Sequence, residues 1–381
     1  MQPPIGATSA AQQNSLLKRA SSSYQLLYSF AGGSDGANPW AGLVNVHGTL
    51  YGTTVDGGAN GYGTVFSVTT TGAEKVLHTF AGSPADGAAP YAGLINVNGT
   101  LYGTTFYGGA HGYGTYYVAG TVFSVTTTGK EKVLYSFAYG SAQGFGPYAD
   151  LIDVKGTLYG TTYDGGAYYN GTVFRVTMTG KEKVVHSFGY GSDGSQPLAG
   201  LINVKGVLYG TTPTGGADGI GAVFSVTRSG AEKVLYSFSG GSDGENPDAA
   251  LTDVKGKLYG TTATGAPSSG GTVFSITTTG KEKTLYDFCI KRKCTDGSGP
   301  EARLVDVSGT LYGTTIYGGL YGKGTIFSVT TTGKEKVLYS FGNGSDGNTP
   351  YAGLIAVNGT LYGTTTYGGA SGNGTVFAFT P

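Results

Sequence analysis

The chain of 381 residues carries 23 Lys and Arg against 23 Asp and Glu, so its formal net charge is zero, and only 12% of its residues are charged. This balance argues against a nucleic-acid partner, because binding to phosphates requires clustered Lys and Arg. The chain has no run of about 18 apolar residues, which argues against a transmembrane segment, while its 71 glycines and 29 tyrosines are far above ordinary usage.

The first 23 residues are polar and rich in Ala, Ser and Gln. They lack the basic start and the apolar core of a secretory signal, so we predict a flexible leader over 1–23 rather than an intact signal peptide. One interpretation is a mature exported protein whose signal has been removed. The alternative is an intracellular protein with a flexible start.

The segment 24–30, Tyr-Gln-Leu-Leu-Tyr-Ser-Phe, is the first stretch with the pattern of a strand, and it matches the end of later repeats. Next comes Gly-Thr-Leu-Tyr-Gly-Thr-Thr at 48–54, which returns six more times with small changes. The tyrosines of the seven copies are Tyr51, Tyr102, Tyr159, Tyr209, Tyr259, Tyr312 and Tyr362, spaced 50 to 57 residues apart. A period of this size indicates a repeat architecture.

The second repeat shows the content of one unit: residues 92–105, a Gly-rich loop, residues 120–129 and residues 130–137. These runs hold four short stretches of β-branched and aromatic residues, separated by turn signals and without helical periodicity. A two-residue Asn-Gly turn joins the first two stretches and favours a tight hairpin, and another Gly turn joins the last two. Each unit is therefore predicted to be a four-stranded antiparallel sheet.

Both faces of these strands carry apolar or small residues, so each sheet is expected to pack between two neighbours. Seven such sheets predict an all-β protein with one domain at 24–381, a seven-bladed β-propeller. The last repeat ends after its third strand, and 24–30 supplies the fourth, which closes the ring and leaves few open edges; an open solenoid is the alternative. Gly52 and its six equivalents, inside a strand, are expected to let an adjacent backbone approach closely. We expect a monomer.

The complete unit, from Gly-Thr-Leu-Tyr-Gly-Thr-Thr through Gly-Thr-Val-Phe-Ser-Val-Thr to Gly-Lys-Glu-Lys-Val-Leu-Tyr-Ser-Phe, resembles the GloVer tandem repeat family across residues 24–381. Its Leu-Tyr-Gly-Thr-Thr-x-x-Gly-Gly core is more distantly similar to the kelch blade. GloVer repeats occur in bacterial proteins with varied surface anchors. The resemblance therefore implies an exported protein of the cell surface or envelope, and it implies no reaction.

Cys289 and Cys294 lie five residues apart in one loop. A pair at this spacing binds metal only with two further ligands, and the loop offers no second pair and no nearby His. We predict a local disulfide, which agrees with an oxidising compartment. No metal site and no cofactor are predicted from this pair.

The loops share the signature Gly-Ser-Asp-Gly-x-x-Pro, and we predict that each Asp side chain closes its own turn. Calcium is the weaker alternative, because a calcium loop needs several alternating oxygen ligands and each blade offers one. The loop aspartates are Asp35, Asp86, Asp193, Asp243, Asp296 and Asp346. Glu-Lys pairs begin the fourth strands and are predicted to form a solvated charged rim; their acids are Glu74, Glu131, Glu182, Glu232, Glu282 and Glu335.

The long connections lie on one face of the predicted ring, and binding sites on a rigid scaffold are usually formed by such loops. On that face, the residue that enters each innermost strand differs from blade to blade. These residues are Trp40, Tyr91, Tyr148, Leu198, Asp248, Glu301 and Tyr351. Two positions later, the Gly of four repeats is replaced by Asp150, Ala250 and Arg303 in the other three.

We predict that these residues surround the mouth of the central channel, with aromatic rings on one arc and charges on the other. Flat aromatic faces beside carboxylates and a guanidinium suit a sugar ring. The predicted ligand-binding residues are Trp40, Tyr91, Tyr148, Tyr351, Asp150, Asp248, Glu301 and Arg303. The simpler interpretation of Arg303 is that it pairs with neighbouring acids.

The leading hypothesis is an exported, non-catalytic propeller that binds carbohydrate or an envelope partner through this face. The first alternative is a polysaccharide-cleaving enzyme at the channel mouth. A glycoside hydrolase would draw its paired carboxylates from Asp150, Asp248 and Glu301, whereas a lyase would use His111 with Tyr113 or Tyr117 as acid and base. The second alternative is a structural or protein-interaction scaffold, with the tyrosines of this face as its interface.

Overall fold

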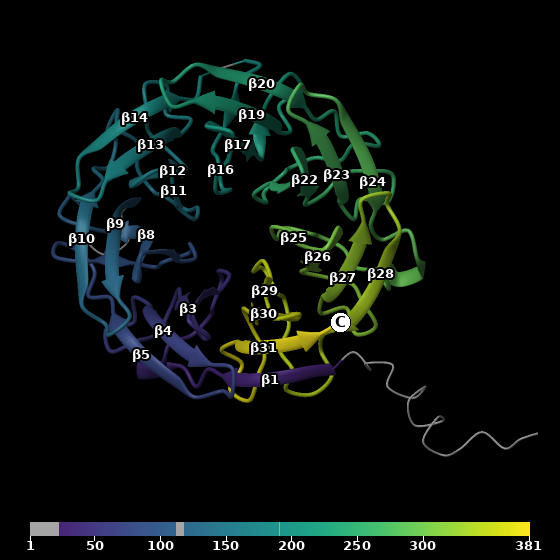
Figure 1. Cartoon of the computed structure of the whole chain (residues 1–381), viewed down its shortest axis with the longest axis horizontal. Helices are drawn as coiled ribbons and strands as arrows, with labels where there is room; N and C mark the ends of the chain where they lie inside the picture. Colours follow the sequence, from purple (N-terminus) through teal and green to yellow (C-terminus); the bar gives the residue numbers. More distant parts are fainter. Residues whose placement is uncertain (1–22, 112–117, 190) are drawn as a thin grey trace, which may run out of the picture.

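Each repeat folds into a four-stranded antiparallel sheet, as the turn pattern predicts. The computed structural model describes residues 23–111, 118–189 and 191–381, and it arranges seven such sheets around a central channel (Figure 1). The protein is an all-β, seven-bladed β-propeller. We number the blades one to seven in chain order, starting with β2–β5 and ending with β29–β31 plus β1. Within the described residues, no helix is long and apolar enough to cross a membrane.

Every blade places its shortest strand at the channel and its last strand at the rim. The innermost strands are β2 (Val44–Val46), β7 (Ile95–Val97), β11 (Ile152–Asp153), β16 (Ile202–Val204), β21 (Thr252–Val254), β25 (Val305–Val307) and β29 (Ile355–Val357). The second strands are β3 (Thr49–Thr54), β8 (Thr100–Gly108), β12 (Thr157–Thr162), β17 (Val207–Thr212), β22 (Lys257–Thr262), β26 (Thr310–Thr315) and β30 (Thr360–Thr365). The third strands are β4 (Thr64–Thr69), β9 (Val118–Thr126), β13 (Thr172–Thr177), β19 (Ala222–Thr227), β23 (Thr272–Thr277), β27 (Thr325–Thr330) and β31 (Thr375–Thr380). The outer strands are β5 (Glu74–Thr79), β10 (Glu131–Ser136), β14 (Glu182–Ser187), β20 (Glu232–Ser237), β24 (Glu282–Asp287), β28 (Glu335–Ser340) and β1 (Ser23–Ser29). The loops add β6 (Gly87–Ala88), β15 (Gly194–Ser195), β18 (Thr214–Gly215) and the 3-10 turns η1 (Gly33–Asp35) and η2 (Arg292–Cys294).

The hairpin between the first two strands has the predicted turn. Both central residues have positive φ, 52° at Asn98 and 84° at Gly99, which is the backbone of a type I′ turn. Asn96 adds a side-chain contact, because its Oδ1 accepts a 2.9 Å hydrogen bond from the Gly99 amide. The turn fixes the register, so that alternate residues of the innermost strand face the channel.

The hydrophobic core lies between blades rather than within them. Phe30 of blade seven and Phe66 of blade one are both 0% exposed and pack in a T shape, with ring centroids 5.0 Å apart. Equivalent Phe pairs join every neighbouring pair of blades, and each hydrophobic cluster contains residues of two adjacent blades. Burying one such side chain is worth about 1.5–3 kcal/mol. A single blade therefore cannot bury its two faces alone.

The close approach at Gly52 involves side chains and not an adjacent backbone, so that part of the prediction is wrong. Gly52 pairs across the hairpin with Phe66, and a Cβ on Gly52 would lie 2.6 Å from Phe66 Cζ and 2.9 Å from Leu43 Cδ2. The Phe ring lies over the glycine and occupies the volume of the missing side chain. Position 52 therefore requires glycine, because the Phe66 ring of the same blade fills the space that a side chain would occupy.

The ring closes where the N-terminal strand meets the last repeat. Strand β1 pairs antiparallel with β31 from Ser23 opposite Thr380 to Ser29 opposite Thr375, and it forms the outer strand of blade seven. Closure is therefore confirmed, and the solenoid alternative is wrong. Residues 1–22 of the predicted leader at 1–23 lie outside the described residues, whereas Ser23 is the first residue of β1.

Candidate functional site

The central channel forms a cavity of about 830 Å³. Its wall consists of the seven innermost strands and the short segments that lead into them. Neighbouring segments contact each other through backbone, since a Cβ on Gly42 would lie 3.1 Å from the carbonyl oxygen of Gly353. The residues predicted at the channel mouth all line this cavity: Trp40, Tyr91, Tyr148, Leu198, Asp248, Glu301 and Tyr351, with Asp150, Ala250 and Arg303 two positions further on.

Four aromatic side chains from consecutive blades form a continuous arc at the mouth. The ring of Trp40 stacks on Tyr351 with centroids 4.1 Å apart and meets Tyr91 edge-on at 5.7 Å. Tyr91 in turn stacks on Tyr148 at 4.8 Å. Phe106, which sequence reasoning missed, supports this pair from the side, with its ring edge-on at 5.8 Å from each of the two tyrosines.

Asp248 and Glu301 lie on the adjacent blades five and six, outside this arc, and both are half-buried. Burial raises the pKa of Asp248 to about 7, and the charge of Glu301 adds to the shift. Burial also raises the pKa of Glu301 to about 7. Oδ1 of Asp248 is shielded from solvent and has no hydrogen-bond partner among the described residues. The pair can thus hold a proton at neutral pH and has unused capacity to accept hydrogen bonds.

The hydroxyl of Tyr148 is influenced by this acid pair. Burial raises its pKa, and the charges of Tyr91, Glu301, Tyr351 and Asp248 raise it further. Tyr148 therefore stays a neutral hydrogen-bond donor.

Asp150 and Arg303 face the channel further along the same segments. Oδ1 of Asp150 accepts a 2.6 Å hydrogen bond from the Gly93 amide of the preceding blade. Enclosure by the channel walls raises the pKa of Asp150, while this hydrogen bond and Arg303 oppose the shift. Arg303 is exposed to the channel solvent and makes no ion pair within 4.0 Å among the described residues. Its charge interacts with that of Asp150 without a direct contact, since each group shifts the pKa of the other toward the charged form.

Of the residues of the lyase alternative, only His111 is described, and it does not lie at the channel mouth. His111 is exposed and forms a β-bridge with Ala138, which follows the outer strand β10. It is not one of the described residues that line the cavity. Tyr113 and Tyr117 lie outside the described residues.

The repeat pattern places the chain in a known family. The sequence model of the Gloeobacter/Verrucomicrobia repeat matches residues 10–119, 116–306 and 290–381. The chain belongs to this family. The match confirms the resemblance to the GloVer repeat, and no curated protein matches the sequence.

Solved structures share the fold of this Gloeobacter/Verrucomicrobia repeat protein at low identity. Selenomethionine-substituted virginiamycin B lyase from Staphylococcus aureus is similar with a TM-score of 0.61 and 14% identity, over 94% of this chain and 99% of that chain. A putative 6-phosphogluconolactonase from Bacteroides uniformis is similar with a TM-score of 0.52 and 15% identity, over 84% of this chain and 88% of that chain. At these identities the likeness concerns the fold alone.

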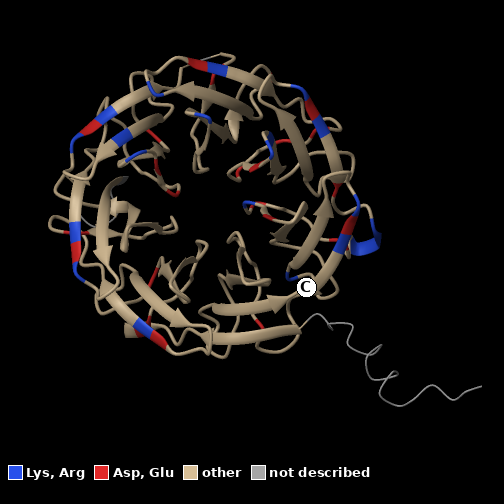
Figure 2. Ribbon diagram, in the orientation of Figure 1, with Lys and Arg blue, Asp and Glu red and all other residues tan. Residues whose placement is uncertain are grey.

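In the predicted charged rim of this repeat protein, the lysines are exposed to solvent and the glutamates are half-buried. The lysines of the Glu-Lys pairs are exposed, and charged residues recur around the outer strands (Figure 2). The glutamates are half-buried, and one carboxylate oxygen is shielded from solvent and has no hydrogen-bond partner among the described residues in Glu74, Glu131, Glu182, Glu232 and Glu335. The reason is that each outer hairpin packs on the preceding blade, so that a Cβ on Gly72 would lie 2.5 Å from Leu27 O.

Most of these glutamates face an Asp and an aromatic or His residue of the preceding blade; Glu182 is the exception, because the loop after the outer strand of blade two carries no Asp. We call this site a rim pocket: a Tyr or His of one outer strand, the Asp of the loop after it, and the Glu that begins the next outer strand. The complete rim pockets are Tyr28–Asp35–Glu74, His78–Asp86–Glu131, His186–Asp193–Glu232, Tyr236–Asp243–Glu282 and Tyr286–Asp296–Glu335. Burial raises the pKa of Glu74, Glu131, Glu182, Glu232 and Glu282 to about 7.

The loop aspartates close their turns, as predicted. Asp35 accepts a 2.6 Å hydrogen bond from the Ala31 amide and a 2.8 Å bond from the Tyr28 hydroxyl.

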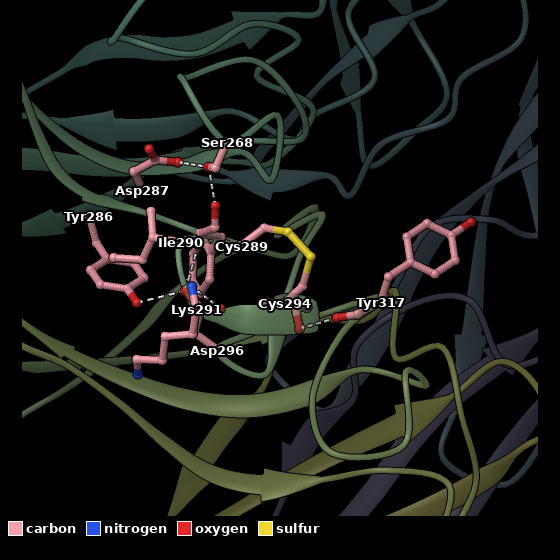
Figure 3. Close-up of a disulfide and its surroundings, with 11 residues drawn as sticks. Ser268, Tyr286, Asp287, Cys289, Ile290, Lys291, Cys294, Asp296 and Tyr317 are labelled. Carbon is pink, nitrogen blue, oxygen red and sulfur yellow. Dashed lines mark hydrogen bonds between the residues drawn. A yellow bond between two sulfur atoms is a disulfide. The ribbon is translucent and has the colours of Figure 1, made fainter.

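The predicted disulfide is also present. Cys289 and Cys294 are bonded in the loop after β24. The same loop contains Asp296, which accepts a hydrogen bond from the Tyr286 hydroxyl (Figure 3).

Proposed function

We propose that this member of the Gloeobacter/Verrucomicrobia repeat family is an exported protein that binds carbohydrate at the mouth of its central channel. The observation that carries the proposal is the aromatic arc of Trp40, Tyr91, Tyr148 and Tyr351, which lines the same cavity as Asp248 and Glu301. A sugar ring has an apolar face that stacks on an aromatic ring and hydroxyls that bond to polar groups. The mouth supplies both kinds of surface.

The polar side of the mouth has free bonding capacity. Asp248 Oδ1 lacks a partner among the described residues, and the guanidinium of Arg303 makes no ion pair there. Carboxylates accept hydrogen bonds from sugar hydroxyls, and a guanidinium donates to hydroxyl or carboxylate oxygens. A cavity of about 830 Å³ lies within the range of small-molecule sites, which is about 300–1,000 Å³.

Export is supported by the disulfide between Cys289 and Cys294. Disulfides persist in oxidising compartments and are rare in the reducing cytosol. A surface or envelope location would also give the channel mouth access to polysaccharides.

Retention on insoluble neutral and acidic polysaccharides tests the proposal. We expect at least one polysaccharide to retain the protein, and Trp40→Ala and Tyr91→Ala to weaken retention by about tenfold, since a stacked ring is worth about 1 kcal/mol or more. Trp40→Phe keeps a flat ring and should retain most of the binding, while Tyr169→Ala, at an exposed tyrosine that does not line the cavity, is the matched control. Failure of every polysaccharide to retain the protein, or full retention by the folded Ala variants, would overturn the proposal and favour a protein-interaction scaffold.

A second candidate function is cleavage of the bound polysaccharide. The acid pair favours it: two carboxyl groups on adjacent blades with pKa values near 7 can act as general acid and base at neutral pH. Soluble oligosaccharide released from the same panel separates the two functions. A hydrolase should lose release and keep retention in Asp248→Asn and Glu301→Gln, whereas retention with no release by the wild-type protein rules cleavage out for that panel.

A further inference from the structure

Two of the five complete rim pockets have a different composition from the others. In blades one and three, His78 and His186 occupy the position that is Tyr in the other blades. Each brings an imidazole nitrogen next to two carboxylates, in the sets His78–Asp86–Glu131 and His186–Asp193–Glu232. Within each set the ligand atoms all lie within 4.8 Å of one another. Both sets join the outer strands of two adjacent blades.

The ligand atoms of these pockets are held in place. Asp86 is 7% exposed, and it accepts hydrogen bonds from the Ala81 amide at 2.9 Å and the Gly87 amide at 2.6 Å. The ring of His78 packs edge-on against the buried Phe80, with centroids 4.9 Å apart. These contacts fix the directions of the carboxylate and the imidazole before any ion binds, which favours metal binding.

Nε2 of His78 lies at a hydrogen-bond distance of 3.0 Å from Asp86 Oδ2, but other acceptor capacity in the His pockets is left unused. One carboxylate oxygen of Glu131 and one of Glu232 are shielded from solvent and have no hydrogen-bond partner among the described residues. Nε2 of His186 lies 3.4 Å from Asp193 Oδ2 and makes no hydrogen bond with a described residue. Shielded acceptors without a donor are costly unless a proton or a cation joins them.

A rim pocket elsewhere in the ring holds a cation. In the pocket Tyr286–Asp296–Glu335, Nζ of Lys291 lies 2.9 Å from Glu335 Oε2, although the Glu335 side chain is only 1% exposed. Lys291 belongs to the loop closed by the Cys289–Cys294 disulfide, close to Asp296 (Figure 3). The pocket geometry therefore accommodates a positive charge between blades, and here the chain supplies it.

We propose that the two His pockets each bind one divalent transition-metal ion, with zinc as the best fit. The ligands are Nε2 of the His and one oxygen each from the Asp and the Glu, and a water completes four-coordination. Imidazole with carboxylates suits zinc, whereas calcium and magnesium take oxygen ligands. With metal–ligand distances of about 2.1 Å, ligand atoms lie about 3.4 Å apart, so small rotations of the side chains complete the site. The ions cross-link blade one to blade two and blade three to blade four.

Metal stoichiometry tests this proposal. Protein treated with EDTA is dialysed against zinc chloride, and bound zinc is measured by mass spectrometry. We expect two ions per chain in the wild type, one in His78→Tyr, one in His186→Tyr and none in the double variant. Tyr is the native residue at this position in other blades, so these variants keep a side chain that the fold already accepts; circular dichroism in EDTA checks this.

Two further variants make the outcome decisive. Tyr236→His builds a third His pocket with Asp243 and Glu282 and should add one zinc ion, while His47→Gln, at an exposed turn, should change nothing. Zinc should raise the melting temperature of the wild type and leave that of the double variant unchanged. Equal zinc uptake by the wild type and the folded double variant, or no uptake by the wild type, would overturn the proposal.

Discussion

Tyr24 stacks on Tyr339 across the seam where the ring closes, with ring centroids 4.3 Å apart and planes inclined by 8°. Tyr24 is the second residue of β1, at the position where the other outer strands carry the rim glutamate. Its hydroxyl donates to the backbone oxygen of Asp346, so the last blade interface has an aromatic contact in place of a carboxylate. This is the interface that joins the two ends of the chain.

The seam contact should contribute to the stability of the whole ring. Tyr24→Ala removes the stacked pair and also the contacts with Phe341 and Phe377, and we expect the free energy of unfolding to fall by about 2–4 kcal/mol. Urea unfolding followed by circular dichroism measures this. Tyr24→Phe keeps the ring and should lose no more than about 1.5 kcal/mol. An unchanged midpoint in Tyr24→Ala would contradict a closed ring.

The fold was predictable because the repeats encode it seven times. Turn residues such as Asn98-Gly99 fix hairpins locally, and one register then holds for all blades. The channel mouth was predictable for the same reason, since a residue at a fixed offset before each innermost strand must reach the same place in every blade. Because they share this offset, Trp40 and Tyr351 are stacked, although they lie 311 positions apart in the sequence.

The side-chain contacts between blades could not be predicted from the sequence in the same way. The burial of Glu74 depends on how far one hairpin leans on its neighbour, which no local pattern records, although Glu recurs at this position with a loop Asp in most repeats. Phe106 lies within β8, at a position where other blades carry residues as different as Pro213 and Thr366. Its contact with Tyr91 and Tyr148 follows only from the packing of adjacent blades.

Stability should fall as the pH rises toward neutrality. Asp248 and Glu301 have folded-state pKa values of about 7, against 3.8 and 4.5 for free Asp and Glu side chains. Between these values the folded state binds more protons than the unfolded state, so their stabilising effect is complete at acidic pH and is lost as the pH passes 7. Thermal unfolding from pH 5 to pH 8 should show a melting temperature that declines with pH. The decline should be smaller in the double variant Asp248→Asn, Glu301→Gln, and an identical slope in both proteins would contradict the assignment.

Gly52 should tolerate no side chain. In Gly52→Ala the new Cβ would meet Phe66 Cζ at 2.6 Å, inside the core, and we expect a loss of about 1–3 kcal/mol in the free energy of unfolding. Adding Phe66→Leu shortens the opposing side chain, so the double variant should lose less than the sum of the two single variants. Urea titrations of the three proteins measure this coupling. Strict additivity would show that the Phe ring is not what requires glycine.

Lys291 should stabilise the fold only while Glu335 is charged. Lys291→Ala leaves a carboxylate whose side chain is 1% exposed without its cation, and we expect a loss of about 1–3 kcal/mol in the free energy of unfolding. Glu335→Gln removes the charge and keeps the shape, so the double variant should recover most of the loss. A double-mutant cycle on urea unfolding isolates this coupling from the other effects of each substitution. Lys336→Ala, at an exposed lysine on β28, serves as the control and should change stability by less than about 0.5 kcal/mol. A Lys291→Ala variant as stable as this control would show that solvent, and not Lys291, neutralises Glu335.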